Sequence, residues 1–333
     1  MSSKRRQPPE WAEHQWVWIG FPSHEDLWEE DLEPARQEVI AFAEAVHAGG
    51  AGEEVRLVAA DPASARAALQ MAPFATIVQE PFGDIWLRDT GPIILKERGL
   101  PIATSFPFNG WGGKYQLEGD DTVGMRLAET ADLEPIRYDW ILEGGAIDGD
   151  GTGLLVTTEQ CLLNPNRNPG LSRADIERRL REQLGAQRVL WLGEGLLNDH
   201  TDGHVDNLAR FVGEGRLALP VPAGADDPNA AVYADARARA EAFGLEVVPL
   251  PSPGRVTRPA EGGDADEIIP ASYMNFYIGN AALVVPLYGA PNDQAAVAAI
   301  GALFPGRKAV GIRADHVLTG GGSFHCISQQ VPK

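Results

Sequence analysis

Residues 207–219 read Asn-Leu-Ala-Arg-Phe-Val-Gly-Glu-Gly-Arg-Leu-Ala-Leu. Two largely apolar runs flank the turn Gly213-Glu214-Gly215, a pattern that predicts a β-hairpin. Residues 230–243 follow with apolar residues at helical spacing, and residues 245–248 form a short strand-like run. The sequence here predicts a unit of strand, strand, helix and strand.

The same unit recurs along the chain. Further hairpins are predicted over residues 91–104, 146–156 and 275–285, each with a turn that contains glycine. Helical spacing over 174–184 and 294–303 precedes short strands at 188–191 and 309–312. Repetition of a mixed unit without long linkers predicts modules arranged around an axis, in a closed ring.

The two ends of the chain each carry an unpaired strand. Residues 16–21 are apolar and lack a nearby hairpin partner, and the strand-like run after Cys326 ends the chain. We expect these two strands to complete one module together.

Composition limits the function classes. The chain has 333 residues, of which 44% are hydrophobic and 23% charged, as in a globular protein of one or two domains. Its formal charge, 28 − 47 = −19, disfavours nucleic acid and anionic membranes as partners and would attract a cationic small molecule. Acidity also serves solubility in many proteins, so the charge is a weak pointer.

Two features of the sequence indicate the cellular compartment of the protein. The chain has two cysteines, too few for a disulfide framework, which favours a reducing compartment. Lys4, Arg5 and Arg6 precede Gln7-Pro8-Pro9-Glu10, where a signal peptide needs an apolar run, and no stretch approaches the roughly 20 apolar residues of a membrane span. We expect a soluble cytoplasmic protein without a membrane partner.

Cys326 is the candidate nucleophile. It lies between the glycine run 320–322, which permits close approach of the backbone to a ligand, and a strand-like stretch. The alternative is a small buried apolar residue, as most free cysteines are. Cys161 has no such setting, and we interpret it as structural.

Other chemically active residues precede the predicted hairpins. Asp89 and Glu143 are 54 residues apart, Glu143 and His204 are 61 apart, and His204 and Cys326 are 122 apart, twice 61. Equivalent ends of successive modules would bring them to one face. Taken singly, Asp89 could cap a turn, Glu143 could be a loop carboxylate and His204 a structural imidazole.

Asp206 would share a strand face with His204, because side chains alternate along a strand. A metal site is the main chemical rival, since these two residues with Glu143 and Asp89 could bind zinc or manganese. Their spacing does not match the usual zinc patterns, so we expect no metal.

The motifs together closely resemble the agmatine deiminases within the family of Porphyromonas-type peptidyl-arginine deiminases. The resemblance implies a single domain over residues 1–333, with the α/β fold of a five-module propeller (the pentein fold) and an active site on its central axis. It implies no metal and no organic cofactor, and it is compatible with a homo-oligomer. The motifs that carry it are Pro9-Glu10-Trp11, Asp84-Ile85-Trp86-Leu87-Arg88-Asp89-Thr90-Gly91-Pro92, Phe108-Asn109-Gly110-Trp111-Gly112-Gly113, Leu142-Glu143-Gly144-Gly145, Asn164-Pro165-Asn166-Arg167-Asn168-Pro169, Gly203-His204-Val205-Asp206-Asn207 and the Cys326 segment.

The resemblance also implies the role of each site residue. Cys326 attacks the guanidinium carbon, and His204 acts as general acid and base. Asp89 and Asp206 bind guanidinium nitrogens, whose planar fork carboxylates match, and Glu143 orients substrate and histidine.

Three further residues are assigned to substrate binding. We expect Gly321 to bind substrate, and Trp86 and Trp111 to form the wall around the substrate tail, where the tryptophans could also contact an amine. Ordinary core packing is the alternative for either tryptophan. We also expect residues 164–169 to line the entrance.

The three carboxylates near Cys326 should raise the pKa of its thiol in the empty enzyme, and a bound cation should lower it again.

Four residues depart from the usual agmatine deiminase pattern, and they bear on the substrate tail. We expect agmatine, a dication that suits an acidic protein. Peptidyl-arginine, free arginine, another guanidino compound, transfer of the amidino group to an amine, and guanidino binding without turnover stay open. The four positions are Gly110 in place of Ala, Ser323-Phe324 in place of Asn-Ile, and Ser328 in place of Thr.

Overall fold

The computed structural model describes residues 5–259 and 266–333, so that Lys4 of the basic N-terminal run lies outside the described residues. The α-helices of this part are α1 (Glu25–Trp28), α2 (Leu32–His47), α3 (Pro62–Met71), α4 (Leu87–Thr90), α5 (Gly110–Gly113), α6 (Val123–Thr130), α7 (Glu159–Leu162), α8 (Arg173–Arg179), α9 (Ala230–Phe243) and α10 (Asp293–Leu303). The strands are β1 (His14–Gly20), β2 (Glu54–Ala59), β3 (Thr76–Gln79), β4 (Ile93–Glu97), β5 (Leu100–Ser105), β6 (Ile136–Arg137), β7 (Ile147–Gly149), β8 (Leu154–Thr158), β9 (Arg188–Leu192), β10 (Arg210–Gly213), β11 (Arg216–Val221), β12 (Glu246–Pro251), β13 (Thr257–Pro259), β14 (Asp266–Ile268), β15 (Tyr277–Ile278), β16 (Ala282–Leu287), β17 (Lys308–Arg313) and β18 (Ser328–Pro332).

Most of these strands belong to mixed sheets with one connectivity. In the sheets β4-β5-β6, β7-β8-β9, β10-β11-β12 and β15-β16-β17, the first two strands are antiparallel and the third is parallel to the second. A helix precedes the third strand of each: α6, α8, α9 or α10. The predicted unit of strand, strand, helix and strand is confirmed.

The two ends of the chain share a further sheet, of order β18-β1-β2-β3. Strand β1 pairs antiparallel with β18, with Trp18 opposite Gln329, and parallel with β2. Helix α2 connects β1 to β2, so this sheet repeats the common unit with its first strand taken from the end of the chain. The predicted pairing of the first and last strands is confirmed.

Helix α9 occupies the residues predicted for it, and the helix predicted over residues 174–184 differs in form. Its first part is α8. Ser172 and Asp175 exchange hydrogen bonds at the N-terminus of this helix and form a capping box. Residues Leu180–Leu184 continue as a π-helical turn, η4, and Gly185 ends it with φ +78°. A left-handed residue at this position, usually glycine, commonly ends a helix.

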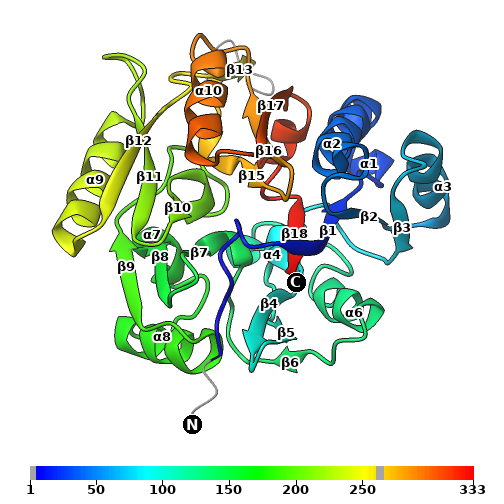
Figure 1. Cartoon of the computed structure of the whole chain (residues 1–333), viewed down its shortest axis with the longest axis horizontal. Coiled ribbons are helices and arrows are strands. Elements are labelled where there is room, and N and C mark those ends of the chain that lie inside the picture. Colours follow the sequence, from blue (N-terminus) through cyan, green and yellow to red (C-terminus); the bar gives the residue numbers. More distant parts are fainter. Residues whose placement is uncertain (1–4, 260–265) are drawn as a thin grey trace.

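Hydrophobic side chains of neighbouring sheets pack into shared clusters. One cluster joins Val156 of β8 and Leu190 of β9 to Phe211, Leu217 and Tyr233 of the next unit. Figure 1 shows the longer helices at the periphery and β7, β18 and α4 near the middle of the molecule. Because neighbouring units pack against one another in this way, the first residues of their hairpins are held next to one another.

No helix within residues 5–259 or 266–333 has both the length and the apolar character needed to cross a membrane.

Candidate active site

A cavity of about 430 Å³ brings together residues from both ends and the middle of the chain. Cys326, Asp89, Trp86, Trp111 and Gly321, all predicted site residues, line it. His204, Asp206 and Glu143 are fully buried and lie behind this lining layer.

Cys326 lies in a turn that immediately precedes β18 and is 4% exposed. Its carbonyl oxygen accepts a hydrogen bond from the backbone N–H of Arg88 at 3.0 Å, which ties the turn to α4. Asn275 Nδ2 lies 3.0 Å from the Cys326 sulfur, and Asn275 Oδ1 accepts from the backbone N–H of His325 at 3.0 Å. Both backbone and side chain of the nucleophile candidate are therefore fixed.

Asn275 was missed by the sequence reasoning. It ends η6 (Tyr273–Asn275), two residues before β15, and is the first residue of the hairpin predicted over 275–285. That position corresponds to those of Asp89, Glu143 and His204 before their own hairpins, and this equivalence was the available signal.

The Cys326 thiol lies in an anionic setting. Burial, followed by the Asp206 and Asp89 carboxylates, raises its pKa well above the ordinary value of a thiol. The Cys326 sulfur is 3.6 Å from Asp206 Oδ2. The direction agrees with the expectation for the empty site, although burial is the largest cause and only two of the three expected carboxylates, Asp206 and Asp89, are among the leading causes.

His204 comes directly before the 3₁₀ turn η5 (Val205–Asn207) and is fully buried. Its Nδ1 is 3.6 Å from Asp89 Oδ1, and neither ring nitrogen has a hydrogen-bond partner among the described residues. Burial alone would lower the pKa of His204, but the Asp89 carboxylate, followed by Cys161 and Glu143, outweighs it and holds the pKa well above the usual value. The imidazole can therefore carry a proton beside Asp89, which lines the cavity with Cys326.

Asp206 lies in η5, so the prediction that it shares a strand face with His204 is wrong. The residues come together because the chain makes a tight turn there, not through strand alternation. Asp206 Oδ2 is 2.7 Å from His325 Nδ1, whereas Oδ1 has no partner among the described residues. Burial would raise the pKa of Asp206, and the bond and charge of His325 lower it instead.

Asp89 lies in α4, and its two carboxylate oxygens have different donors. Trp111 Nε1 donates to Oδ2 and the backbone N–H of Gly145 donates to Oδ1, both at 2.9 Å. Burial raises the pKa of Asp89. A Cβ on Gly145 would lie 2.6 Å from His204 Nδ1 and 2.7 Å from Asp89 Oδ1, so a glycine is needed for this approach.

Glu143 forms a buried ion pair with Arg167. Arg167 Nε donates to Glu143 Oε1 at 2.6 Å, and Glu143 Oε2 has no partner within the described residues. Arg167 belongs to the segment 164–169, which we expected at the entrance. The cavity lining contains none of these residues, and the segment instead holds Glu143 from behind.

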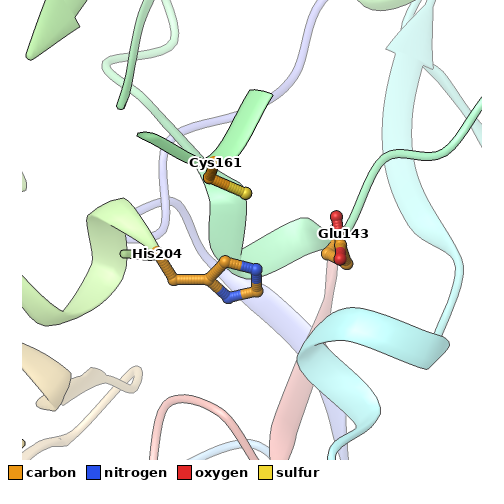
Figure 2. Close-up of side chains that lie close together, drawn as sticks. All are labelled: Glu143, Cys161 and His204. Atoms are coloured by element: carbon orange, nitrogen blue, oxygen red, sulfur yellow. The ribbon is translucent and has the colours of Figure 1, made fainter. Parts of the chain in front are cut away.

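Cys161, interpreted from sequence as structural, lies beside the candidate general acid and base. One ligand atom each of Glu143, Cys161 and His204 fall within 4.8 Å of one another, and all three residues are buried. Figure 2 shows the Cys161 sulfur and the Glu143 carboxylate on two sides of the His204 ring. Within residues 5–259 and 266–333, this trio has the spacing of a possible metal site, whereas the four residues considered from sequence as an alternative to the expected absence of a metal do not form such a group.

The cavity lining also contains tryptophans and acidic residues. Asp84 accepts hydrogen bonds from Trp86 Nε1 at 2.6 Å and from Trp28 Nε1 at 3.1 Å. Burial raises the pKa of Asp84 to about 6. Gly321, with φ +101°, lines the same cavity. Trp86 and Trp111 therefore line the cavity as predicted, and each also donates to a carboxylate.

Comparison with known proteins identifies the family. Residues 6–332 match the model of the Porphyromonas-type peptidyl-arginine deiminases. An agmatine deiminase of Stutzerimonas stutzeri is 37% identical over 98% of this chain and 95% of the relative. The solved agmatine deiminase of Enterococcus faecalis superposes with a TM-score of 0.91 at 32% identity, over 99% of this chain and 96% of that one.

Two further structures extend the comparison. A Cys-to-Ser variant of the C. jejuni agmatine deiminase with substrate bound has a TM-score of 0.90 at 30% identity, over 99% of this chain and 96% of that one. The DDAH of Pseudomonas aeruginosa shares the fold alone, with a TM-score of 0.51 at 13% identity. The chain therefore belongs to the Porphyromonas-type peptidyl-arginine deiminase family.

Proposed function

We propose that the protein is an agmatine deiminase, which hydrolyses the guanidinium of agmatine to N-carbamoylputrescine and ammonia. The observation that carries the proposal is one cavity whose lining contains a cysteine, an aspartate next to the buried His204, and a second buried aspartate: Cys326, Asp89 and Asp84. The agmatine deiminases among the relatives support the same choice.

The guanidinium binds between the two aspartates. Its planar fork of N–H donors matches carboxylates, and Asp206 Oδ1 is a buried acceptor without a partner in the described part of the chain. Asp89 lies on the cavity side, and Asp206 lies beside the Cys326 sulfur. This arrangement supports placing the guanidinium carbon within reach of the thiol.

The reaction proceeds through a covalent adduct. As the cationic substrate binds, the Cys326 thiol gives its proton to solvent, and the thiolate attacks the guanidinium carbon, forming a C–S bond and a tetrahedral intermediate. His204 gives its proton to one amino group, the C–N bond breaks, and ammonia leaves a thiouronium on Cys326. His204 then takes a proton from water, whose oxygen attacks the same carbon. As the C–S bond breaks, the added hydroxyl gives its remaining proton to solvent, and the ureido product and the thiolate are released. Glu143 orients His204.

The charge of the cavity lining selects a cationic tail. Asp84, Glu29 and Glu30 line the cavity, as does Asp31, whose Oδ1 lies 2.6 Å from His316 Nδ1, and such residues favour the ammonium of agmatine over the carboxylate of free arginine. Arg258 also lines it but is engaged with Glu267 Oε2 at 3.8 Å. Trp86, Trp111 and Gly321 enclose the alkyl chain between the two charges.

The departures from the usual agmatine deiminase pattern lie elsewhere. Ser323, Phe324, Ser328 and Gly110 are buried, and none of them lines the cavity. Phe324 stacks on Phe42 with ring centroids 5.0 Å apart. These differences alter packing behind the site, which leaves the tail pocket suited to agmatine.

The whole chain forms one catalytic domain, a five-module propeller with the site on its axis. Support comes from the common connectivity of the sheets, from the β1–β18 pairing of the two ends, and from the likeness to relatives over nearly the full chain.

The test is a comparison of substrates. Agmatine, free arginine and a blocked arginine peptide are incubated separately with the purified protein, and ammonia and ureido product are measured. Agmatine should give both products with the highest kcat/KM. Turnover of arginine or the peptide in preference to agmatine would overturn the substrate assignment, and silence on all three would overturn the deiminase assignment.

A further inference from the structure

His325, next to the nucleophile, lies between two carboxylates. Its Nδ1 is 2.7 Å from Asp206 Oδ2, and its Nε2 is 2.7 Å from Glu10 Oε2. The side chain is 3% exposed. Ionised carboxylates can only accept hydrogen bonds, so both ring nitrogens serve as donors in this arrangement.

Glu10 is itself fixed on its other sides. Its Oε1 accepts from the backbone N–H of Ile278 at 2.8 Å, and its Oε2 accepts from Arg210 Nη2 at 2.7 Å. Burial would raise the pKa of Glu10, but Arg210 and His325 hold it well below the usual value. Glu10 belongs to the Pro9-Glu10-Trp11 motif, to which the proposed chemistry gives no role. This distant segment thereby reaches the active site.

The two oxygens of Asp206 are unequal as a result. Oδ2 lies 2.7 Å from His325 Nδ1, 3.4 Å from Asn275 Nδ2 and 3.6 Å from the Cys326 sulfur. Oδ1 is buried and without a partner among the described residues. Rotation of the carboxylate would break the short bond to His325, which keeps Oδ1 as the free acceptor.

We propose that His325 and Glu10 are positioning residues, which together fix the Asp206 carboxylate so that its Oδ1 stays available to the substrate guanidinium beside Cys326. The proposal rests on the proposed function in one respect, the binding of a guanidinium by Asp206. Glu10 orients the ring of His325, and His325 orients Asp206; neither touches the substrate.

Two substitutions of His325 separate its two bonds. In His325→Asn, the amide nitrogen of Asn can occupy the position of Nδ1 and still donate to Asp206. In His325→Gln, the amide nitrogen of Gln can occupy the position of Nε2 and still donate to Glu10. His325→Gln loses the hydrogen bond to the Asp206 carboxylate. Because a hydrogen bond to a charged group is strong, kcat/KM should fall about 10- to 100-fold in this variant. It should fall less in His325→Asn. Glu10→Gln should give an intermediate loss.

The pH profile distinguishes positioning from a general loss of stability. The charged and titratable groups that face Asp206 are His325, His204, Arg210, Asp89 and Cys326. His325 helps to hold the pKa of Asp206 low, so loss of its donor should raise that pKa. The acid limb of kcat/KM should therefore move to higher pH in His325→Gln and move less in His325→Asn.

The chain offers a matched control. His14 is another buried histidine, paired with Glu53 at 3.0 Å, and does not line the cavity. His14→Gln should lower thermal stability and leave kcat/KM and the acid limb of the folded enzyme unchanged. The proposal is overturned if His325→Gln keeps the wild-type acid limb and kcat/KM. It is also overturned if the Asn and Gln variants lose activity equally and only in proportion to their thermal stability.

A second readout needs no turnover. Isothermal titration calorimetry measures the affinity of the wild type for methylguanidinium, at concentrations well below those that unfold the protein. The affinity should be weaker in His325→Gln than in His325→Asn. Equal affinity in both variants overturns the positioning role even if agmatine proves not to be the substrate, whereas failure of the proposed function would appear in the wild-type substrate comparison.

Discussion

At the scale of single residues, the Cys326 thiol sits against charge that opposes its own ionisation. Burial and the Asp206 and Asp89 carboxylates raise its pKa, so at neutral pH the empty enzyme should hold mainly the thiol. The positive charge of a bound guanidinium offsets these two carboxylates and should lower the pKa of Cys326. The substrate thus helps to generate the nucleophile that attacks it.

This thiol can be titrated through its ultraviolet absorbance in an inactive His204→Gln variant, with the same variant lacking Cys326 as the blank. The midpoint should be high without ligand and should fall when agmatine is added. A fall of about 1.5 pH units would correspond to about 2 kcal/mol. A low midpoint in the empty protein would rule out substrate-assisted ionisation.

The pKa of Asp84, about 6, predicts how tail recognition depends on pH. As pH falls through 6, Asp84 gains a proton and loses its attraction for an ammonium, so KM for agmatine should rise. Butylguanidine, which lacks the ammonium, should show no such rise. Asp84 is buried, so Asp84→Asn should raise KM for agmatine about tenfold at neutral pH, as expected for loss of a buried contact between charged groups. Parallel pH profiles for the two substrates would contradict a role of Asp84 in tail binding.

At the scale of elements, the sequence predicted the hairpins and helices of the repeated units, but it did not predict contacts between residues that lie far apart along the chain. The hairpins and α9 have strong local patterns, and the structure has them as expected. The 3₁₀ turn that holds Asp206 has no pattern distinguishable from a strand end. Cys161 and Glu10 were missed because their neighbours, His204 and His325, lie far along the chain. Only the packing of the units against one another brings such pairs together.

The sheet shared by the chain ends predicts the effect of a deletion. Removal of residues 1–20 takes away β1, which lies between β18 and β2, together with the buried Val17, Trp18 and Ile19. The truncated protein should fail to fold, with no cooperative thermal transition by circular dichroism. A stable, active truncation would refute the role of the shared sheet.

The Arg167–Glu143 pair predicts a large loss of stability on substitution. Both side chains are fully buried, so Arg167→Met leaves the Glu143 charge unpaired, which should cost about 3–5 kcal/mol. The exposed pair Arg216–Glu246 is the matched control, and Arg216→Met should cost about 1 kcal/mol or less. Equal losses in urea unfolding of the two variants would show that the buried pair has no special structural role.

At the scale of the whole molecule, the net charge of −19 should act on a dicationic substrate before it binds. Raising the ionic strength screens this field, so kcat/KM for agmatine should decline several-fold between low and about 0.15 M salt, where the screening length is about 8 Å. The decline for free arginine, with a single net charge, should be smaller. Measurement of both substrates across a salt series checks this, and equal slopes would exclude steering by net charge.

The most direct test of the account is the mass of the enzyme caught during turnover. Protein mixed with agmatine and quenched in acid should gain the mass of agmatine less that of ammonia, and the modified peptide should contain Cys326. Cys326→Ala should gain nothing and release no ammonia, although Cys161 is still present. An adduct on Cys161, or full turnover by Cys326→Ala, would contradict the assignment of Cys326 as the nucleophile.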